Sequence, residues 1–159
     1  MVRDYRPVVR AVTAKVQPDM DDWRLMQLVV DALWEAFSTP AGRVSWVGFY
    51  LPGQRGRELF LGPRRDKPAC SPIGLQGVCG QAFASGEAIV VDDVRTLGEN
   101  YIACDPRDRS EVVVPLVGDN GQCRAVLDLD SHEEGAFDEA DVEGLAEVLA
   151  AAGLVEAHG

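Results

Sequence analysis

The apolar residues of this chain change their spacing near residue 40, from a helical period to a period of two. Between residues 20 and 37, large apolar side chains recur every three or four residues, as on one face of an amphipathic helix. This stripe consists of Trp23, Met26, Val30, Leu33 and Phe37, which we expect in the core. Residues 44–51 (VSWVGFYL) are aromatic and β-branched, as is typical of a strand. The chain therefore packs helices against a sheet.

The order of the later elements indicates which kind of sheet this is. We expect a strand near 58–62, a loop over 63–76, a short helix over 78–85, a strand over 88–91, a second loop over 95–109, strands over 111–117 and 122–131, and a last helix capped by Asp138. Asn120-Gly121 is a strong hairpin signal between the last two strands. Strands and helices do not alternate regularly. The sequence thus predicts an α+β fold, a mostly antiparallel central sheet with N- and C-terminal helices packed on one face.

A chain of 159 residues has the size of one domain. We expect this domain over residues 19–156, preceded by an N-terminal extension, residues 1–18, in which 3–17 can form a short helix. The N-terminus contains no apolar segment like that of a secretory signal, and no apolar run reaches the ~18 residues of a membrane span. The sequence therefore predicts a cytoplasmic protein without a membrane segment.

Acidic residues outnumber basic residues by 26 to 15, which gives a formal net charge of −11. Such a charge repels the phosphates of nucleic acids and anionic membrane surfaces. We therefore exclude nucleic acid and membranes as partners.

The four cysteines fit no zinc signature, because no two of them form a C-x₂-C pair. We therefore expect no metal site. Cys123 falls within a predicted strand, where a free cysteine is usually a small buried hydrophobe. Cys70 and Cys104 fall in the two long loops, and long loops often carry function. Their spacing leaves two interpretations open, a nucleophile with a resolving partner or two structural cysteines.

Two carboxylates share one face of a predicted strand. Asp128 and Asp130 alternate with Leu127 and Leu129, so the acids face one side and the leucines face the apolar layer. Glu111, on the neighbouring hairpin strand, can add a third acid. Such a group can bind an ammonium ion, bind a metal or keep one carboxyl protonated, whereas the simpler alternative is a solvated sheet face.

A small-molecule pocket is indicated by the first strand. Trp46, Gly48 and Tyr50 share one of its faces, and a glycine between aromatic residues leaves room where a ligand approaches. The alternative is that both aromatic residues belong to the core.

Taken together, these segments resemble the GAF-domain free methionine-(R)-sulfoxide reductases. The matching segments follow the order of that family: WVGFYL (46–51), LGP (61–63), KPAC (67–70), GVCG (77–80), IACD (102–105), SEVVVPL (110–116) and VLDLDS (126–131). The resemblance covers about residues 25–150, and ordinary GAF sensor domains lack this set of three cysteines with the D-x-D pair. Three segments depart from the family pattern: Arg64-Arg65-Asp66 replaces Phe-Gln-Gly, Leu75-Gln76-Gly77 replaces Gly-Arg-Gly, and Tyr101 replaces a common His.

The resemblance implies a GAF-like fold and thiol-dependent reduction of free L-methionine-(R)-sulfoxide. It implies Cys104 as the nucleophile, Cys70 as the resolving cysteine and Cys79 as a third, relay cysteine. The implied substrate-binding residues are Trp46, Glu111, Asp128 and Asp130, to which the strand pattern adds Tyr50. The resemblance further implies no cofactor, an external dithiol such as thioredoxin, and a homodimer, since GAF domains often pair.

A non-catalytic GAF sensor that binds a small molecule is the alternative function. The two interpretations differ in one geometric requirement. A disulfide between Cys70 and Cys104 needs Cα atoms within ~7 Å of each other.

Overall fold

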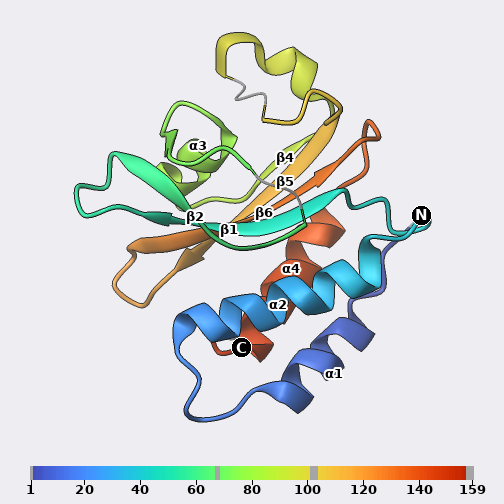
Figure 1. Ribbon diagram of the computed structural model, residues 1–159, viewed down its shortest axis with the longest axis vertical. Helices are drawn as coiled ribbons and strands as arrows, with labels where there is room; N and C mark the ends of the chain where they lie inside the picture. The colour runs from blue at the N-terminus through green and yellow to red at the C-terminus, as the bar shows by residue number, and fades with distance from the viewer. Residues whose placement is uncertain (1, 67–68, 101–103, 157–159) are drawn as a thin grey trace.

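The computed structural model of the protein describes residues 2–66, 69–100 and 104–156 (Figure 1). Residues 67–68 and 101–103, which belong to the segments KPAC and IACD, lie outside the described residues. The elements in chain order are α1 (Arg6–Lys15), α2 (Asp22–Phe37), β1 (Trp46–Pro52), β2 (Glu58–Arg65), β3 (Ile73–Gly74), α3 (Val78–Ser85), β4 (Ile89–Val91), the 3-10 helix η1 (Val94–Asn100), β5 (Ser110–Val117), β6 (Cys123–Ser131) and α4 (Glu139–Ala151).

The strands form one six-stranded sheet in the order β3-β2-β1-β6-β5-β4, and each neighbouring pair is antiparallel. Helices α1, α2 and α4 lie on one face of this sheet, and α3 lies on the other (Figure 1). The predicted α+β architecture is therefore confirmed. No helix in the described part of the chain is long and apolar enough to cross a membrane.

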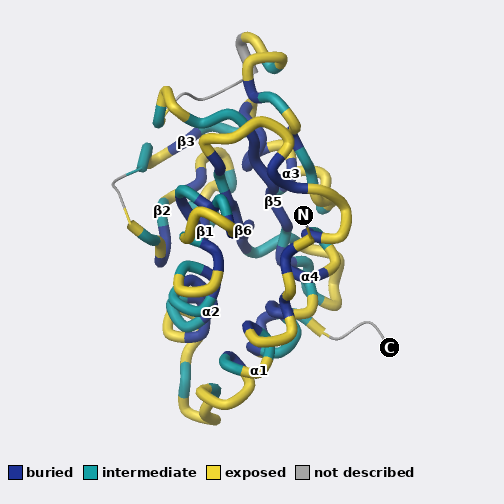
Figure 2. The backbone as a smooth tube through the Cα atoms, turned by 90° about the vertical axis from the view of Figure 1, so that its right-hand side faces the viewer, coloured by how far each residue is buried: buried dark blue, intermediate teal, exposed yellow. Residues whose placement is uncertain are grey.

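Strand alternation gives the sheet two different faces. Val47 and Phe49 of β1 and Leu127 and Leu129 of β6 are fully buried against the helices α1, α2 and α4. The residues between them point to the α3 side, where a smaller apolar cluster contains Trp46, Tyr50 and residues of α3. Figure 2 shows the central strands as the most continuously buried part of the chain. The second face holds the site described below.

The helix ends follow from short polar residues and one glycine. Asp21 caps α2 by accepting a hydrogen bond of 2.9 Å from the Arg24 amide. Asp138 caps α4 as predicted, in a reciprocal capping box with Asp141. Gly86 ends α3 at φ 71°, a left-handed conformation that glycine adopts without strain.

The N-terminal residues pack against the rest of the chain. Val8 and Val12 of α1 are buried in the larger apolar cluster, and α1 contacts both α2 and α4. The proposed boundary at residue 18 stays a prediction.

Three expectations about the elements were wrong. Strand β2 continues to Arg65, because Arg64 and Arg65 pair with Gly48 and Val47 of β1 beyond a bulge. The predicted loops contain the short strand β3 and the 3-10 helix η1. The side chain of Trp23 is not in the core.

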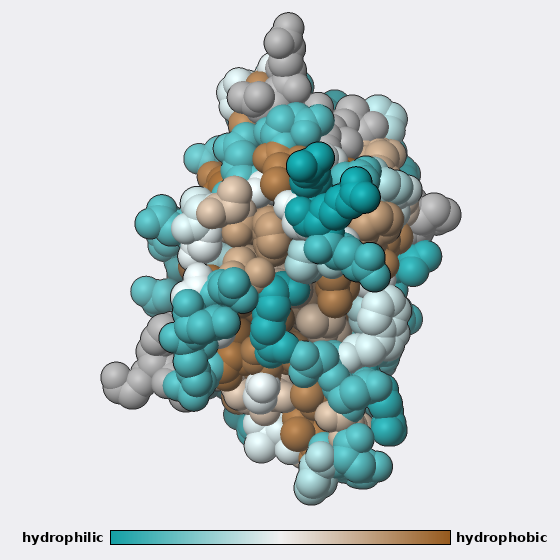
Figure 3. All heavy atoms as spheres, turned by 90° about the vertical axis from the view of Figure 1, so that its left-hand side faces the viewer, coloured by the Kyte–Doolittle hydropathy of each residue, from teal (hydrophilic) through white to brown (hydrophobic). Residues whose placement is uncertain are grey.

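Trp23 is 52% exposed because α2 begins there, and Leu25 and Met26 fill the inward face of its first turn instead. Phe60 of β2 is also exposed, at 43%. On the face shown in Figure 3, apolar side chains gather in small groups that polar side chains separate.

Candidate active site

A cavity of about 70 Å³ lies on the α3 side of the sheet. Seven of the eight predicted site residues line it: Trp46, Tyr50, Cys79, Cys104, Glu111, Asp128 and Asp130. The eighth, Cys70, is bonded to one of these seven through a disulfide. The structure thus brings together residues from β1, α3, β5, β6 and both long loops.

The pairing of β5 with β6 places the three acids side by side. Glu111 is the cross-strand partner of Asp130, and Asp128 lies two residues further along β6 on the same face. Glu111 lies within hydrogen-bonding reach of both aspartates. Asp128 and Glu111 are only 4% and 8% exposed, so the alternative of a solvated sheet face is wrong.

Burial is the main reason why the cavity favours protonated carboxyls. It raises the pKa of Asp128 and Asp130 well above the usual value of an aspartate, and the neighbouring acids raise it further. The pKa of Glu111 is also raised by burial, although its hydrogen bonds to the two aspartates oppose this. A carboxyl that keeps its proton can donate it to a departing oxygen.

One buried carboxylate oxygen in the cavity lacks a hydrogen-bond donor or a cation to interact with in the described part of the chain. When all three acids are charged, Oδ1 of Asp128 is buried and receives no hydrogen bond from any donor in the described residues. An unpaired buried carboxylate oxygen is costly, so it is satisfied by a shared proton or by a cationic ligand. The cavity is therefore built for a proton or for a small cation such as an ammonium group.

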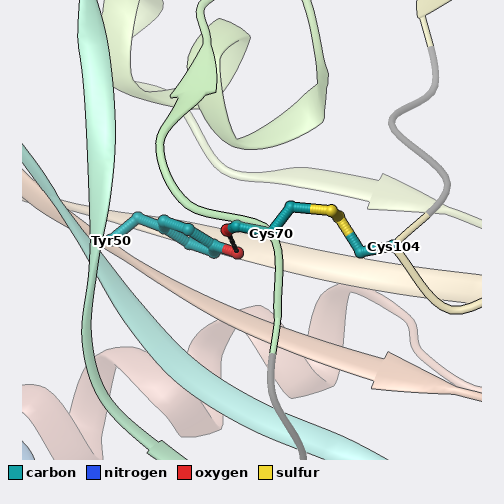
Figure 4. Close-up of a disulfide and its surroundings, with 3 residues drawn as sticks. All are labelled: Tyr50, Cys70 and Cys104. Carbon is teal, nitrogen blue, oxygen red and sulfur yellow. Dashed lines mark hydrogen bonds between the residues drawn. A yellow bond between two sulfur atoms is a disulfide. The ribbon is translucent and has the colours of Figure 1, made fainter.

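Cys70 and Cys104 form a disulfide at the edge of this cavity (Figure 4). Their Cα atoms are 5.6 Å apart, within the ~7 Å that bridging requires. Cys104 is exposed and Cys70 is partly buried. The hydroxyl of the buried Tyr50 donates a hydrogen bond of 2.8 Å to the carbonyl oxygen of Cys70, which ties the first loop to β1.

The two free cysteines have different surroundings. Cys79, in the first turn of α3, is buried at the cavity wall, and burial followed by the charge of Asp128 raises its pKa well above the usual value. Cys123 is only partly buried in β6, and its sulfur lies 3.2 Å from the carbonyl oxygen of Ala125. The expected burial of Cys123 is thus only partial.

Gly48 makes room for an indole rather than for a ligand. A Cβ at this position would lie 2.4 Å from Cη2 of Trp46 and 2.7 Å from Cβ of Arg64. The glycine therefore allows the Trp46 indole to lie across β1, with its ring centroid 6.1 Å from that of Tyr50. The expectation that Gly48 itself admits the ligand was wrong, whereas the aromatic wall lies where it was predicted.

Sequence reasoning missed three polar residues that line the cavity, Ser45, Asp105 and Asp108. Asp108 lies four residues after Cys104 and three before Glu111, in a loop that offered no periodic pattern. Its position between two predicted site residues was the one signal that pointed to it.

Two groups of side chains have potential ligand atoms within 4.8 Å of one another among the described residues. One consists of Cys79, Glu111 and Asp128, and the other of Asp105, Asp108 and His132. Neither contains the paired cysteines or histidines of ordinary zinc sites. We assign no metal to either group, and the absence of a metal site stays a prediction.

Comparison with known proteins agrees with this geometry. The family model described as GAF domain matches residues 23–155. Free methionine-R-sulfoxide reductase from Escherichia coli is 41% identical over 109 residues, and the protein of the same name from Saccharomyces cerevisiae is 36% identical over 115 residues. These matches cover 67% and 71% of this chain, and 63% of each relative, which is less than two thirds of their length.

A solved structure matches over a larger share of both chains. The X-ray structure of free methionine-R-sulfoxide reductase from Neisseria meningitidis in complex with its substrate superposes with a TM-score of 0.82 at 39% identity. The superposition covers 96% of this chain and 90% of that chain.

The fold and the matched model define a GAF domain, one whose cavity is lined by three acids and by one cysteine of a disulfide. Within that class, the chain belongs to the GAF-domain free methionine-R-sulfoxide reductase family. The resemblance that the sequence motifs indicated is confirmed.

Proposed function

We propose that this protein reduces free L-methionine-(R)-sulfoxide to methionine. The observation that carries the proposal is the bonded pair Cys70–Cys104 at the edge of a cavity lined by three acids, of which Glu111 and Asp128 are buried. In its reduced form, as two thiols, the pair provides the two electrons that reduction of a sulfoxide requires, and the acids provide protonated groups for the oxygen. The names of the relatives support this choice of substrate.

The proposed reaction begins with the reduced protein. The Cys104 thiolate attacks the sulfoxide sulfur, the S–O bond breaks, and the oxygen ends on Cys104 with one proton as a sulfenic acid. Methionine leaves with its sulfur reduced by two electrons. The Cys70 thiolate then attacks the Cys104 sulfur, a disulfide forms, and the hydroxyl leaves as water with a second proton. Two thiols and one sulfoxide thus give one disulfide, methionine and water.

The cavity explains a preference for the free amino acid. In our proposal Glu111, Asp128 and Asp130 hold the α-ammonium group and the sulfoxide oxygen, and the Trp46 indole lies against the S-methyl group. A peptide-bound methionine offers a neutral amide nitrogen in place of the ammonium group. Loss of one charge-assisted hydrogen bond costs about 1.5–3 kcal/mol, which corresponds to a ten- to hundredfold weaker interaction.

We propose that regeneration of the thiols needs an external dithiol such as thioredoxin and that it needs no cofactor. The exposure of Cys104 supports this, because an incoming thiolate has to reach one sulfur of the disulfide. We propose a cytoplasmic location, where such dithiols keep thiols reduced. We also propose that the chain pairs as a homodimer.

A coupled assay with single cysteine variants tests this function. With free L-methionine-(R)-sulfoxide and thioredoxin, Cys104→Ser should form no methionine. Cys70→Ser should form about one methionine per chain and then stop, because its sulfenic acid lacks the Cys70 thiol and burial keeps the Cys79 thiol protonated. Cys123→Ser is the matched control and should keep full activity, since Cys123 does not belong to the set that lines the cavity.

Two outcomes would contradict the proposal. Equal rates with the free and the N-acetylated sulfoxide would show that the acids do not select an ammonium group. Binding of the sulfoxide by the reduced protein without formation of methionine would favour a non-catalytic sensor instead.

A further inference from the structure

A histidine and two aspartates lie between the acid cluster and the protein surface. Oδ1 of Asp108 lies 3.8 Å from Nε2 of His132, and Oδ2 of Asp105 lies 3.4 Å from the same nitrogen. The side chain of His132 is 38% exposed, whereas that of Asp108 is 12% exposed. Asp105 and Asp108 line the same cavity as the three acids, so the group connects the cavity with solvent.

The end of the β5–β6 ladder holds these residues together. Ser110 pairs with Ser131, and the Arg109 amide donates a hydrogen bond of 2.8 Å to the Ser131 carbonyl oxygen. His132 follows Ser131 directly and Asp108 precedes Ser110 by two residues, so the end of this ladder brings their side chains within 3.8 Å of each other. Their approach is fixed by the backbone ladder rather than by two flexible surface side chains.

Asp105 is fixed by a separate contact. The Arg107 guanidinium donates two hydrogen bonds to its carboxylate, of 3.1 and 3.0 Å. This contact lowers the pKa of Asp105, which leaves Asp105 a fixed negative charge beside His132.

Asp108 has the surroundings of a group that exchanges a proton near neutral pH. Burial, followed by the charges of Asp105 and Glu111, raises its pKa to about 7, although Arg107 and Arg109 oppose this. The charged and titratable groups around it are Asp105, Arg107, Arg109, Glu111, Asp130 and His132. The charge of Asp108 in turn raises the pKa of Asp130 in the cavity.

We propose that Asp108 and His132 carry protons between solvent and the cavity acids Glu111 and Asp130 while the sulfoxide is reduced, an inference that rests on the proposed function. An imidazole ring has two nitrogens, one of which can accept a proton while the other donates one. His132 exchanges a proton with solvent, Asp108 exchanges it with His132, and the cavity acids exchange it with Asp108.

The relay balances the proposed chemistry without a further reagent. The cavity acids release protons when the substrate ammonium group binds. They must regain one when the oxygen moves to Cys104 and another when the hydroxyl leaves as water. The two protons in that water are those that the two thiols lost, so the relay moves protons and consumes none. Asp108 acts through other groups and is therefore a positioning residue in the proton path.

Single-turnover kinetics over a pH series test the relay. Fully reduced protein is mixed with excess free L-methionine-(R)-sulfoxide in the absence of a reductant, and the methionine formed is measured after rapid quenching. The wild-type rate should fall above about pH 7, where Asp108 loses its proton. Asp108→Asn should lower the rate at acidic pH about tenfold, less than a direct general acid contributes, and should remove this decline. The substrate concentration at half-maximal rate should change less than twofold.

Variants with matched chemistry separate proton transfer from a purely structural role of Asp108 and His132. Asp108→Glu should restore most of the rate, since it restores the carboxyl. His132→Gln should slow the reaction about threefold, and added imidazole should restore its rate. Glu134→Gln, at an exposed acid two residues from His132, is the control and should leave the pH profile unchanged.

Several results would overturn the relay. One is a pH profile of Asp108→Asn that equals that of wild type. Another is a rate of His132→Gln that equals that of wild type. Because His132 is exposed, this second variant decides the question even if Asp108→Asn does not fold. A pH profile that changes when a chelator is added to wild type would assign the group to a metal. If wild type forms no methionine at all, the proposed function fails and the relay fails with it, whereas wild-type turnover with unaffected variants overturns the relay alone.

Discussion

The hydroxyl of Tyr50 couples the site to the loop that carries the resolving cysteine. It donates to the Cys70 carbonyl oxygen across 2.8 Å, and a second contact, from the Leu61 amide to Ser71 Oγ, holds the same loop. Tyr50→Phe removes one hydrogen bond worth about 1 kcal/mol, so we expect disulfide formation to slow about fivefold. Loss of free thiols after one turnover measures this step.

The same Tyr50→Phe protein provides its own control. Formation of the first methionine depends on Cys104 and the acids, so its rate should stay within twofold of wild type. A slower first methionine together with normal disulfide formation would show that Tyr50 acts on the substrate instead.

Because the carboxyl of Asp128 is buried, the free energy of unfolding should fall as pH rises and Asp128 becomes charged. Its pKa is raised in the folded protein, so the folded state binds a proton more tightly than the unfolded state does. The resulting stabilisation is present at acidic pH and is lost as pH rises from about 4 towards the raised pKa. Asp128→Asn stays neutral, so its free energy of unfolding should exceed that of wild type by a margin that grows as pH rises above about 4.

Urea unfolding at several pH values measures this difference. Asp119→Asn, which alters an exposed acid in the hairpin turn, is the control and should follow the wild-type pH dependence. A constant difference between Asp128→Asn and wild type at all pH values would show that Asp128 carries no raised pKa.

At the scale of the elements, the spacing of apolar residues and the turn signals predicted most of the helices and strands that the structure shows. The alternation in VLDLDS placed Leu127 and Leu129 against the helices and the aspartates on the other face, because side chains on a strand alternate without exception unless a bulge intervenes. The bulge between Gly48 and Tyr50 and the pairing of Arg64 and Arg65 with β1 left no comparable signal in the sequence. Bulges and short strands depend on tertiary pairing.

The site residues on strands could be predicted from the sequence better than the site residues in loops. Strand periodicity grouped Asp128 with Asp130 and Trp46 with Tyr50, whereas loop position left the pairing of Cys70 with Cys104 open and the family resemblance then implied it. Asp108 and His132 were not grouped, since only the end of the β5–β6 ladder brings them together. Contacts that a ladder creates between distant residues have no local sequence pattern.

The Trp46 indole, which forms part of the cavity wall, fits against strand β1 only because Gly48 has no side chain. A methyl group there would meet the Trp46 indole at 2.4 Å and Arg64 at 2.7 Å, so Gly48→Ala should displace the indole or bend the strand. Overpacking of this kind costs about 1–3 kcal/mol. We expect a lower melting temperature and at least a fivefold weaker binding of free methionine sulfoxide, measured by calorimetry with reduced protein.

Gly118 offers the matched control for this substitution. A Cβ at Gly118 would meet Oδ1 of Asn120 at 3.3 Å, a side-chain atom in an exposed turn that can move. Gly118→Ala should therefore bind the sulfoxide as wild type does. Equal binding by Gly48→Ala and wild type would show that the position of the indole does not matter.

At the scale of the whole molecule, Arg3 joins three parts of the chain on the helix side of the sheet. Its guanidinium donates to the carbonyl oxygens of Gly42 and Ala136, at 2.9 and 2.7 Å, and to the Asp141 carboxylate at 3.1 Å. Its carbon Cζ lies 4.6 Å from the centroid of the Phe137 ring. The N-terminal segment is thus bound to the body of the domain through a buried ion pair.

Removal of one partner of a buried ion pair leaves an uncompensated charge, which costs about 3–5 kcal/mol. Arg3→Ala should lower the free energy of unfolding by about 3 kcal/mol, since Tyr5 still donates to Asp141 across 2.7 Å. The rate of methionine formation per folded molecule should not change, because the cavity lies on the opposite face of the sheet. Arg6→Ala, which removes an exposed pair with Asp4, is the control and should unfold like wild type. Equal stability of Arg3→Ala and Arg6→Ala would show that the buried pair of Arg3 with Asp141 contributes nothing to the stability of the fold.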